Sequence, residues 1–170
     1  YEDGPAAVLT GLEGLKVLDL TRVLAGPVAT RFLAGFGADV LRIDPPHWNE
    51  AAVEVDVTLG KRCAGLDLKL KEDRLIFEGL LTQADVLVHG YRSDALSGLG
   101  YDSETLKRLN PNLNNISLCA YGWTGPWATR RGFDSLVQMS CGIANEGMQR
   151  ARAQKPVPLP VQALDFATGY

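Results

Sequence analysis

The sequence contains no hydrophobic run long enough to cross a membrane, and its start, YEDGPAAVLT, lacks the basic residues and apolar core of a signal peptide. It also lacks an excess of positive charge, because 17 Lys and Arg residues stand against 20 Asp and Glu, a net charge of −3. No basic stripe is available to neutralise nucleic-acid phosphates. We therefore expect neither a nucleic-acid partner nor a membrane partner, and a cytoplasmic location.

Cysteine and histidine are scarce. Cys63, Cys119 and Cys141 are odd in number and too far apart for a zinc-binding spacing or a disulfide framework, so we expect reduced, partly buried thiols and no metal site. His47 lies in a polar loop and His89 ends a predicted strand. Neither has a serine or cysteine at a spacing typical of a catalytic pair, so histidine-based nucleophilic catalysis is not indicated.

Common nucleotide-binding and hydrolase motifs are missing too. Gly35 and Gly37 follow a predicted helix and precede a strand, which is the reverse of a dinucleotide fingerprint, and the third glycine is absent. Glycines that end a helix are the better interpretation. No Walker lysine loop, HExxH or GxSxG sequence occurs.

What the chain does contain is a strand–helix–strand unit over residues 14–46. Residues 16–20 are a short apolar run typical of a buried parallel strand, Pro27 fits the first turn of a helix, and residues 40–43 form a second strand. A right-handed crossover of this kind puts its loops at the carboxyl ends of the strands, where ligands usually bind.

The rest of the chain continues this alternation. Strands are predicted near residues 64–68, 84–89 and 113–119, and helices near 69–82, 93–99, 103–109, 133–145 and from 163 onward. In the helix over residues 69–82, the residues expected to face the core are Leu70, Leu75, Ile76, Leu80 and Leu81. The pattern predicts an α/β fold with a mostly parallel sheet.

The length and composition set the domain organisation. With 170 residues, 46% of them hydrophobic, the chain is long and apolar enough to bury one hydrophobic core. We expect residues 1–11 to be an N-terminal tail and residues 12–170 to be one domain. The missing initiator methionine and the end within a predicted helix indicate a fragment of a longer enzyme.

Two carboxylates, Asp134 and Asp165, lie at predicted helix starts. The residues alone favour helix caps, in which the side chain accepts backbone N–H groups, with a nucleophilic role of Asp165 as the alternative. Several cations follow predicted strands, on the edge that binds ligands; a solvated surface charge is the simpler interpretation of each, and phosphate binding the alternative. They are Arg22, Arg42, Lys61, Arg62, Lys69, Arg92, Arg130 and Arg131.

Taken in order, several segments together resemble the class III coenzyme A-transferase family, which includes formyl-CoA transferase, carnitine-linked CoA-transferases and α-methylacyl-CoA racemase. They are VLDLTRVLAGPVATRFLAGFGADVLRIDPP, GKRCAGLDLK, ADVLVHGYRSDALSGLGYDSETLKRLNP, ISLCAYGWTGP with RRGFDSLVQMSCGIANEG, and ALDFATGY. The resemblance is to the amino-terminal half of the family. It implies a Rossmann-like large domain, with an open, mostly parallel sheet and helices on both faces, and a homodimer of two interlocked, ring-like chains.

The resemblance also implies a mechanism. Asp165 matches the nucleophilic aspartate, whose attack on an acyl-CoA thioester gives a mixed anhydride and then an aspartyl-CoA thioester, from which a small carboxylic acid takes the CoA. Asp134 matches an acidic residue close to that nucleophile. A helix start at Asp165 would keep the carboxylate ionised and offer backbone N–H groups to a developing oxyanion. Acyl-CoA is then a substrate, and no permanently bound cofactor is implied. By position, the residues that would contact CoA are Val23, Leu24, Leu66, Lys69, Tyr91, Arg92, Ala95 and Arg131.

The chain also departs from the family pattern. The racemase branch carries a histidine where this chain has Phe133, which cannot exchange an α-proton, so transfer is favoured over racemisation. His89–Gly90 replaces the common Glu–Asn, and Ser93–Asp94 replaces the usual Pro–Gly. The resemblance therefore leaves open which acids are exchanged. The alternatives are an acyl-CoA racemase-like enzyme and a non-catalytic fragment that binds CoA or oligomerises.

Overall fold

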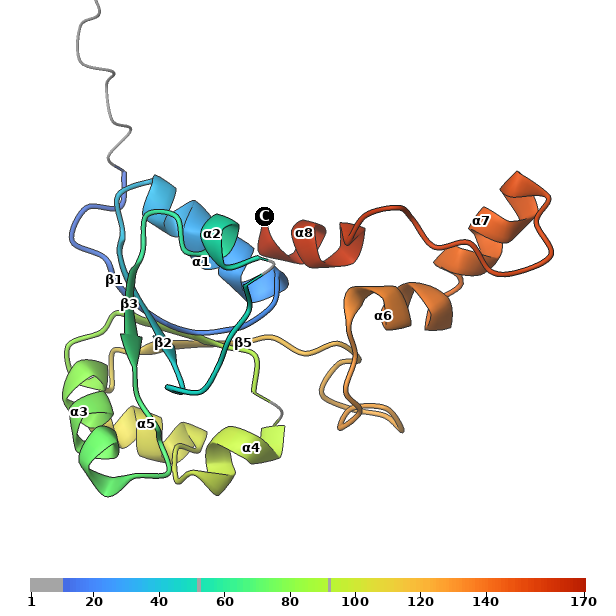
Figure 1. The fold of residues 1–170 in the computed structure, drawn as a ribbon. Coiled ribbons are helices and arrows are strands. Elements are labelled where there is room, and N and C mark those ends of the chain that lie inside the picture. Colours follow the sequence, from blue (N-terminus) through green and yellow to red (C-terminus); the bar gives the residue numbers. More distant parts are fainter. Residues whose placement is uncertain (1–10, 52, 92) are drawn as a thin grey trace, which may run out of the picture.

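Five strands form one parallel sheet in the order β3–β2–β1–β4–β5 (Figure 1). The strands are β1 (Lys16–Leu20), β2 (Asp39–Asp44), β3 (Arg62–Gly65), β4 (Val86–His89) and β5 (Asn114–Ser117). The computed structural model describes residues 11–51, 53–91 and 93–170, so most of the predicted tail lies outside the described residues. The strand order reverses between β1 and β4, as in Rossmann-like sheets, which confirms the predicted fold class.

Helices cover both faces of this sheet (Figure 1). On one face lies α1 (Ala25–Gly35), with α2 (Glu54–Val57) and α8 (Ala163–Gly169) packed beside it. On the other face lie α3 (Lys71–Leu81), α4 (Ser93–Gly98) and α5 (Ser103–Leu109). The side chains of β1 alternate accordingly, because Val17 belongs to the cluster under α1 and Leu18 to the larger cluster under α3–α5. The remaining helices, α6 (Asp134–Ser140) and α7 (Ile143–Ala151), extend away from the sheet.

Two local predictions need correction. The single helix expected over residues 133–145 is two helices, since Gly142 has a left-handed backbone with φ 95° and interrupts the chain between α6 and α7. In α3 the buried residues are Phe77 and Leu81, one turn apart, and the expected core residue Leu75 is 61% exposed. Leu70 and Ile76 are exposed as well, because a single helix face cannot hold every apolar residue of this stretch.

A buried ion pair joins β1 to α1 and to the segment before β3. The Asp19 carboxylate accepts hydrogen bonds from Lys61 Nζ at 2.8 Å, from Thr30 Oγ1 at 2.6 Å and from the N–H of Thr21 at 2.8 Å. The Lys61 ammonium also bonds the Pro27 carbonyl at 2.9 Å, and neither charged side chain is exposed. Burial lowers the pKa of Lys61, which Asp19 partly counteracts. Because both charges are buried, removing either residue would leave the other charge without its counter-charge.

Lys61→Met is expected to lower the free energy of unfolding by about 3–5 kcal/mol, because Asp19 then stays buried without its counter-charge. The next residue, Arg62, provides the control, since its ion pair with Asp39 lies at the surface. Arg62→Met is expected to cost about 1 kcal/mol or less. Urea unfolding of both variants measures the two effects, and losses of equal size contradict the structural role of the buried pair.

Candidate active site

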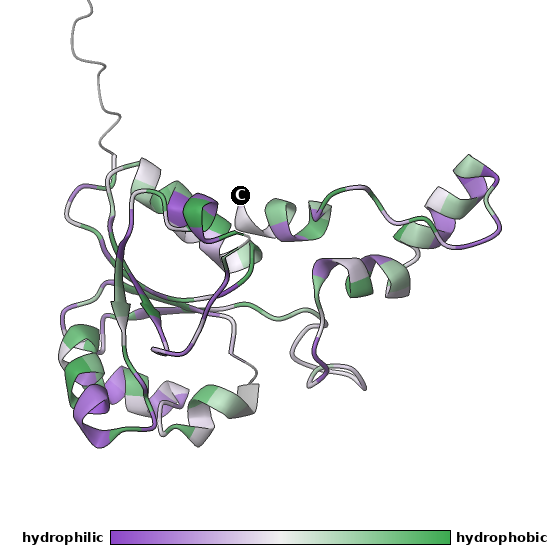
Figure 2. Cartoon of the chain, in the orientation of Figure 1, coloured by the Kyte–Doolittle hydropathy of each residue, from purple (hydrophilic) through white to green (hydrophobic). Residues whose placement is uncertain are grey.

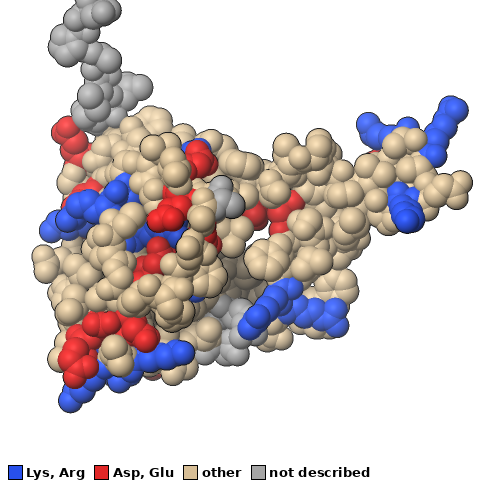
Figure 3. All heavy atoms as spheres, in the orientation of Figure 1, with Lys and Arg blue, Asp and Glu red and all other residues tan. Residues whose placement is uncertain are grey.

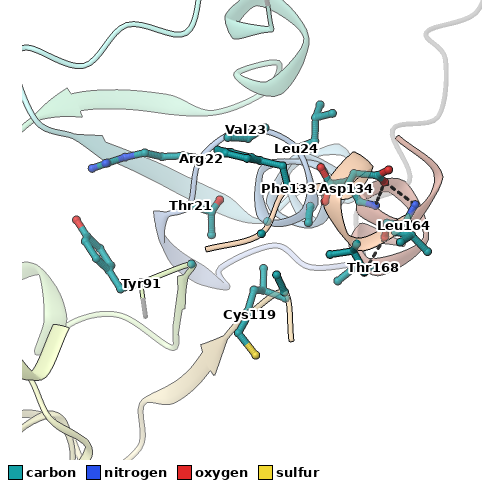
Figure 4. A pocket seen from close by; sticks show the side chains of 18 of the residues that line it. Thr21, Arg22, Val23, Leu24, Tyr91, Cys119, Phe133, Asp134, Leu164 and Thr168 are labelled. Carbon is teal, nitrogen blue, oxygen red and sulfur yellow. Dashed lines mark hydrogen bonds between the residues drawn. The ribbon is translucent and has the colours of Figure 1, made fainter. Parts of the chain in front are cut away.

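A pocket of about 460 Å³ opens at the carboxyl edge of the sheet, where the strand order reverses between β1 and β4 (Figure 4). Open α/β sheets bind their ligands at this place. The lining comes from the end of β1 with the loop and helix start that follow it, from the residues that follow β4 and β5, from the start of α6 with the residues just before it, and from α8. The described lining residues are 20–26, 90–91, 118–120, 132–134, 137, 164–165 and 168.

The loop after β1 has an unusual backbone. Val23 is a β-branched residue with φ 68°, a left-handed conformation that such residues rarely adopt. Its N–H donates to Glu50 Oε1 at 2.8 Å, while Glu50 Oε2 accepts from the buried Arg42 at 2.7 Å. At Gly26 an added Cβ would lie 2.3 Å from Thr21 Cγ2, so only glycine fits there. The loop is thus held by the hydrogen bond from Val23 to Glu50 and by the close packing of Gly26 on Thr21.

Arg22 forms one end of the pocket. Its guanidinium lies 4.2 Å from the centre of the Trp48 ring and 5.9 Å from that of Tyr91, and its Nε is 3.8 Å from Asp44 Oδ1. Contacts of this kind hold an arginine by cation–π attraction and leave donors for an anion. Arg22 is the one cation among the described lining residues, and in Figure 4 it lies on the opposite side from Asp134.

Asp134 forms the acidic end. Its Oδ2 accepts the backbone N–H groups of Leu164 at 2.7 Å and Asp165 at 2.9 Å, so a residue of α6 caps the first turn of α8 (Figure 4). The expectation that each aspartate caps its own helix is wrong. Phe133 holds the N-cap position of α6 and Gln162 that of α8, and neither side chain makes a capping bond. The first turn of α8 therefore takes its acceptor from another helix.

Asp165 lies in the first turn of α8, half-buried at the pocket. Burial, and then repulsion by Asp134, raises the pKa of its carboxyl group. Asp134 occupies the N–H groups of Leu164 and Asp165, which corrects the expectation that they are free for an oxyanion. The helix itself packs closely on α1, because a Cβ at Gly169 would lie 2.8 Å from the Ala25 carbonyl oxygen. The backbone thus fixes where Asp165 lies.

The model of the family described as "CoA-transferase family III" matches residues 12–170. The chain belongs to CoA-transferase family III. A succinate–glutarate CoA-transferase of Agrobacterium fabrum is 35% identical over 177 residues, which cover 93% of this chain and 44% of that protein. The human succinyl-CoA:glutarate CoA-transferase is 32% identical, over 93% of this chain and 39% of its own length.

A solved structure of a family relative has the same fold. The crystal structure of Rv3272 from M. tuberculosis matches with a TM-score of 0.82 and 32% identity, over 94% of this chain and 47% of that chain. The family and the fold that the sequence motifs indicated are both confirmed. This chain spans less than half the length of the CoA-transferases it matches.

The structure brings five of the predicted site residues together around the pocket. They are Val23, Leu24, Tyr91, Asp134 and Asp165. Those of the other predicted CoA contacts that the structure describes do not line it. Two of them follow β3, where Leu66 is buried in the core and Lys69 is exposed, while Ala95 is half-buried in α4. Arg131 is exposed and directly precedes Gly132, which lines the pocket. Arg92 lies outside the described residues.

Sequence reasoning missed Gln138, a fully buried side chain in α6 that hydrogen-bonds Asp134. The available signal was the spacing of four residues between an acid and an amide on one predicted helix. The cysteines are exposed rather than partly buried, and Cys119 lines the pocket. Within the described part of the chain, no three His, Cys, Asp or Glu residues lie close enough to hold a metal ion. No helix in that part has the length and apolar composition needed to cross a membrane.

Asp165→Asn is expected to stabilise the fold at neutral pH, raising Tm by a few degrees, because it removes a desolvated charge beside Asp134. A carboxyl pKa that is raised on folding lowers stability as pH rises from the ordinary value, 3.8, through the raised one, so the gain should vanish in acid. Thermal unfolding between about pH 3 and pH 8 measures this. Glu146→Gln, at an exposed carboxylate on α7, is the control. A lower Tm for Asp165→Asn at neutral pH would contradict the prediction.

Proposed function

We propose that the protein transfers coenzyme A between an acyl-CoA and a carboxylic acid, with the Asp165 carboxylate as nucleophile. The observation that carries this proposal is the placement of Asp165 in a pocket at the switch point of a CoA-transferase family sheet, beside a second acid that raises its pKa. Two of the relatives named above are a succinate–glutarate CoA-transferase and a succinyl-CoA:glutarate CoA-transferase, and another relative is an acetyl-CoA:oxalate CoA-transferase. A carboxylic acid acceptor is therefore the substrate class we propose.

The chemistry can proceed without net proton transfer. An Asp165 oxygen attacks the thioester carbonyl, the C–S bond breaks, and CoA leaves as a thiolate, so that the acyl group and Asp165 form a mixed anhydride. The thiolate then attacks the Asp165 carboxyl carbon, which releases the donor acid and leaves an aspartyl-CoA thioester. The acceptor carboxylate repeats these steps in reverse, forming a new anhydride and then a new acyl-CoA. The raised pKa suits this role, because a more basic carboxylate is a better nucleophile.

The opposite charges at the two ends of the pocket, Arg22 and Asp134, would orient a bound acyl-CoA. Arg22 offers donors for an anionic group at the end opposite Asp134, with Tyr91 beside it, and Val23 and Leu24 line the path between the ends. We assign the remaining CoA contacts to Leu66, Lys69, Ala95 and Arg131, on loops and helix starts along the carboxyl edge of the sheet. We assign one more to Arg92, which lies outside the described residues. The exposed cysteines carry no disulfide, which fits the reducing cytoplasm that we propose as the compartment.

The test uses the full-length protein, incubated with a panel of acyl-CoA donors and acids and then digested for mass spectrometry. We expect a CoA adduct on the peptide containing Asp165. In Asp165→Asn the adduct should be absent and the turnover lower by on the order of 10³-fold, because an amide is a poor nucleophile. Glu146→Gln should match the parent protein.

The outcomes separate this proposal from its alternatives. Unchanged turnover in Asp165→Asn, or an adduct on another peptide, contradicts the mechanism. Deuterium uptake at the α-carbon of an acyl-CoA in heavy water, without exchange between acids, indicates a racemase-like enzyme. Binding of CoA with no exchange of either kind indicates a non-catalytic module.

We also propose a homodimer, in which a second copy covers the exposed apolar side chains of the α6–α7 arm, defined as residues 133–161. The arm carries apolar side chains that are exposed in this chain: Phe133, Leu136, Met139, Val157, Leu159 and Val161. Figure 2 shows these apolar stretches on α6 and before α8, and Figure 3 shows few charges there except at the tip of the arm. An apolar surface of this extent is unusual for a monomer and typical of an interface.

Combined Leu136→Glu and Met139→Glu substitutions are expected to weaken dimerisation of the full-length protein at least about tenfold, because they place charges in an apolar interface. Sedimentation over a concentration series measures the dissociation constant. Gln149→Glu adds the same kind of charge at an exposed position of α7 and should have little effect. A dimer of unchanged strength in the double variant would contradict the proposed interface.

A further inference from the structure

Gln138 is the least exposed polar side chain of the α6–α7 arm, with only 1% of its surface exposed, although the arm projects from the body of the protein. Its amide is saturated with partners. Nε2 donates to Asp134 Oδ1 and to the Val161 carbonyl at 3.1 Å, and Oε1 accepts the N–H of Leu159 at 2.7 Å. One side chain thus joins α6 to the segment that leads into α8.

These bonds restrict how the Asp134 carboxylate can turn. Its Oδ1 is held by Gln138, and its Oδ2 is left facing the N–H groups of Leu164 and Asp165. A carboxylate with only one oxygen held can rotate and exchange its oxygens, whereas here each oxygen has its own partner from a different part of the chain. The capping of α8 therefore depends on a residue that does not line the pocket.

We propose that Gln138 is a positioning residue, which holds the Asp134 carboxylate against the first turn of α8 and so fixes the position of Asp165. The inference rests on the proposed function only in taking Asp165 as the reacting group. The side chain required is a neutral amide, because it must donate to a carboxylate and a carbonyl while accepting from an N–H. Methionine offers none of these bonds, and an ionised glutamate offers acceptors alone.

The charged groups around Asp165 make the orientation of Asp134 matter. From α6 the only acid is Asp134, and from α1 the only charged side chain is Arg31, which is paired with Asp56. The loop after β1 contributes Arg22 at the other end of the pocket, and the segment after β5 contributes the Cys119 thiol. Asp134 is also the charge that acts on the Asp165 carboxyl.

Two variants of the full-length protein test the proposal. Gln138→Met should lower kcat at least about tenfold while KM for acyl-CoA changes less than about twofold, because the reacting carboxylate is displaced and the binding loops are not. Gln138→Glu should stay near the parent rate at low pH, where a protonated carboxyl can still donate to Asp134. Its rate should fall toward that of Gln138→Met once the new carboxyl ionises. Gln149→Glu on α7 is the matched control and should keep the parent pH profile.

Hydrogen exchange gives a readout that does not depend on the proposed reaction. In Gln138→Met, the amides of Leu164 and Asp165 should exchange about tenfold faster than in the parent, with α1 unchanged, because the α8 cap is lost. Should the parent protein transfer no CoA, this measurement still decides the role of Gln138. Unchanged protection of these amides in a folded Gln138→Met overturns the proposal. If that variant does not fold, a Gln138→Glu protein with the parent protection and pH profile overturns it.

Discussion

The buried pair of Asp19 and Lys61 is the interaction on which the position of the site depends. Asp19 is the fourth residue of β1, and its carboxylate holds the N–H of Thr21, where the pocket loop begins. The same pair reaches α1 through Thr30 and Pro27, and α1 in turn carries α8 with Asp165. A charge pair without solvent contact is demanding in its geometry, since both ions need several partners. The pair therefore fixes the relative positions of β1, the loop after it, α1 and α8.

The features of the site affect folding stability in opposite directions: the bonds and contacts of α8 stabilise the fold weakly, and the charge of Asp165 destabilises it. Asp165 is desolvated beside another acid, which opposes folding at neutral pH, yet this is the environment that makes a carboxylate basic. The capping bonds from Asp134 to α8 and the contact of Gly169 with α1 hold the helix in place despite that opposition. The local cost in stability and the raised pKa of Asp165 thus have the same origin.

Much of the scaffold could be predicted from local pattern. The apolar run of β1 and the bounds of α5 agree with the structure, because short-range periodicity and capping determine them. The break at Gly142 was missed because an isolated glycine within a helical pattern is ambiguous. The role of Asp134 was misassigned for a different reason. Its partners lie about 30 residues further along the chain, and no local rule relates an acid to a distant helix start.

The left-handed backbone of Val23 has a consequence for ligand entry. Glu50 and Arg42 maintain this conformation through contacts within the chain, with no ligand needed to stabilise it. This part of the pocket wall is therefore ordered before any ligand binds, so a ligand loses little affinity to the ordering of the loop. A rigid wall of this kind favours ligands whose shape matches the pocket over ligands that would require the loop to move.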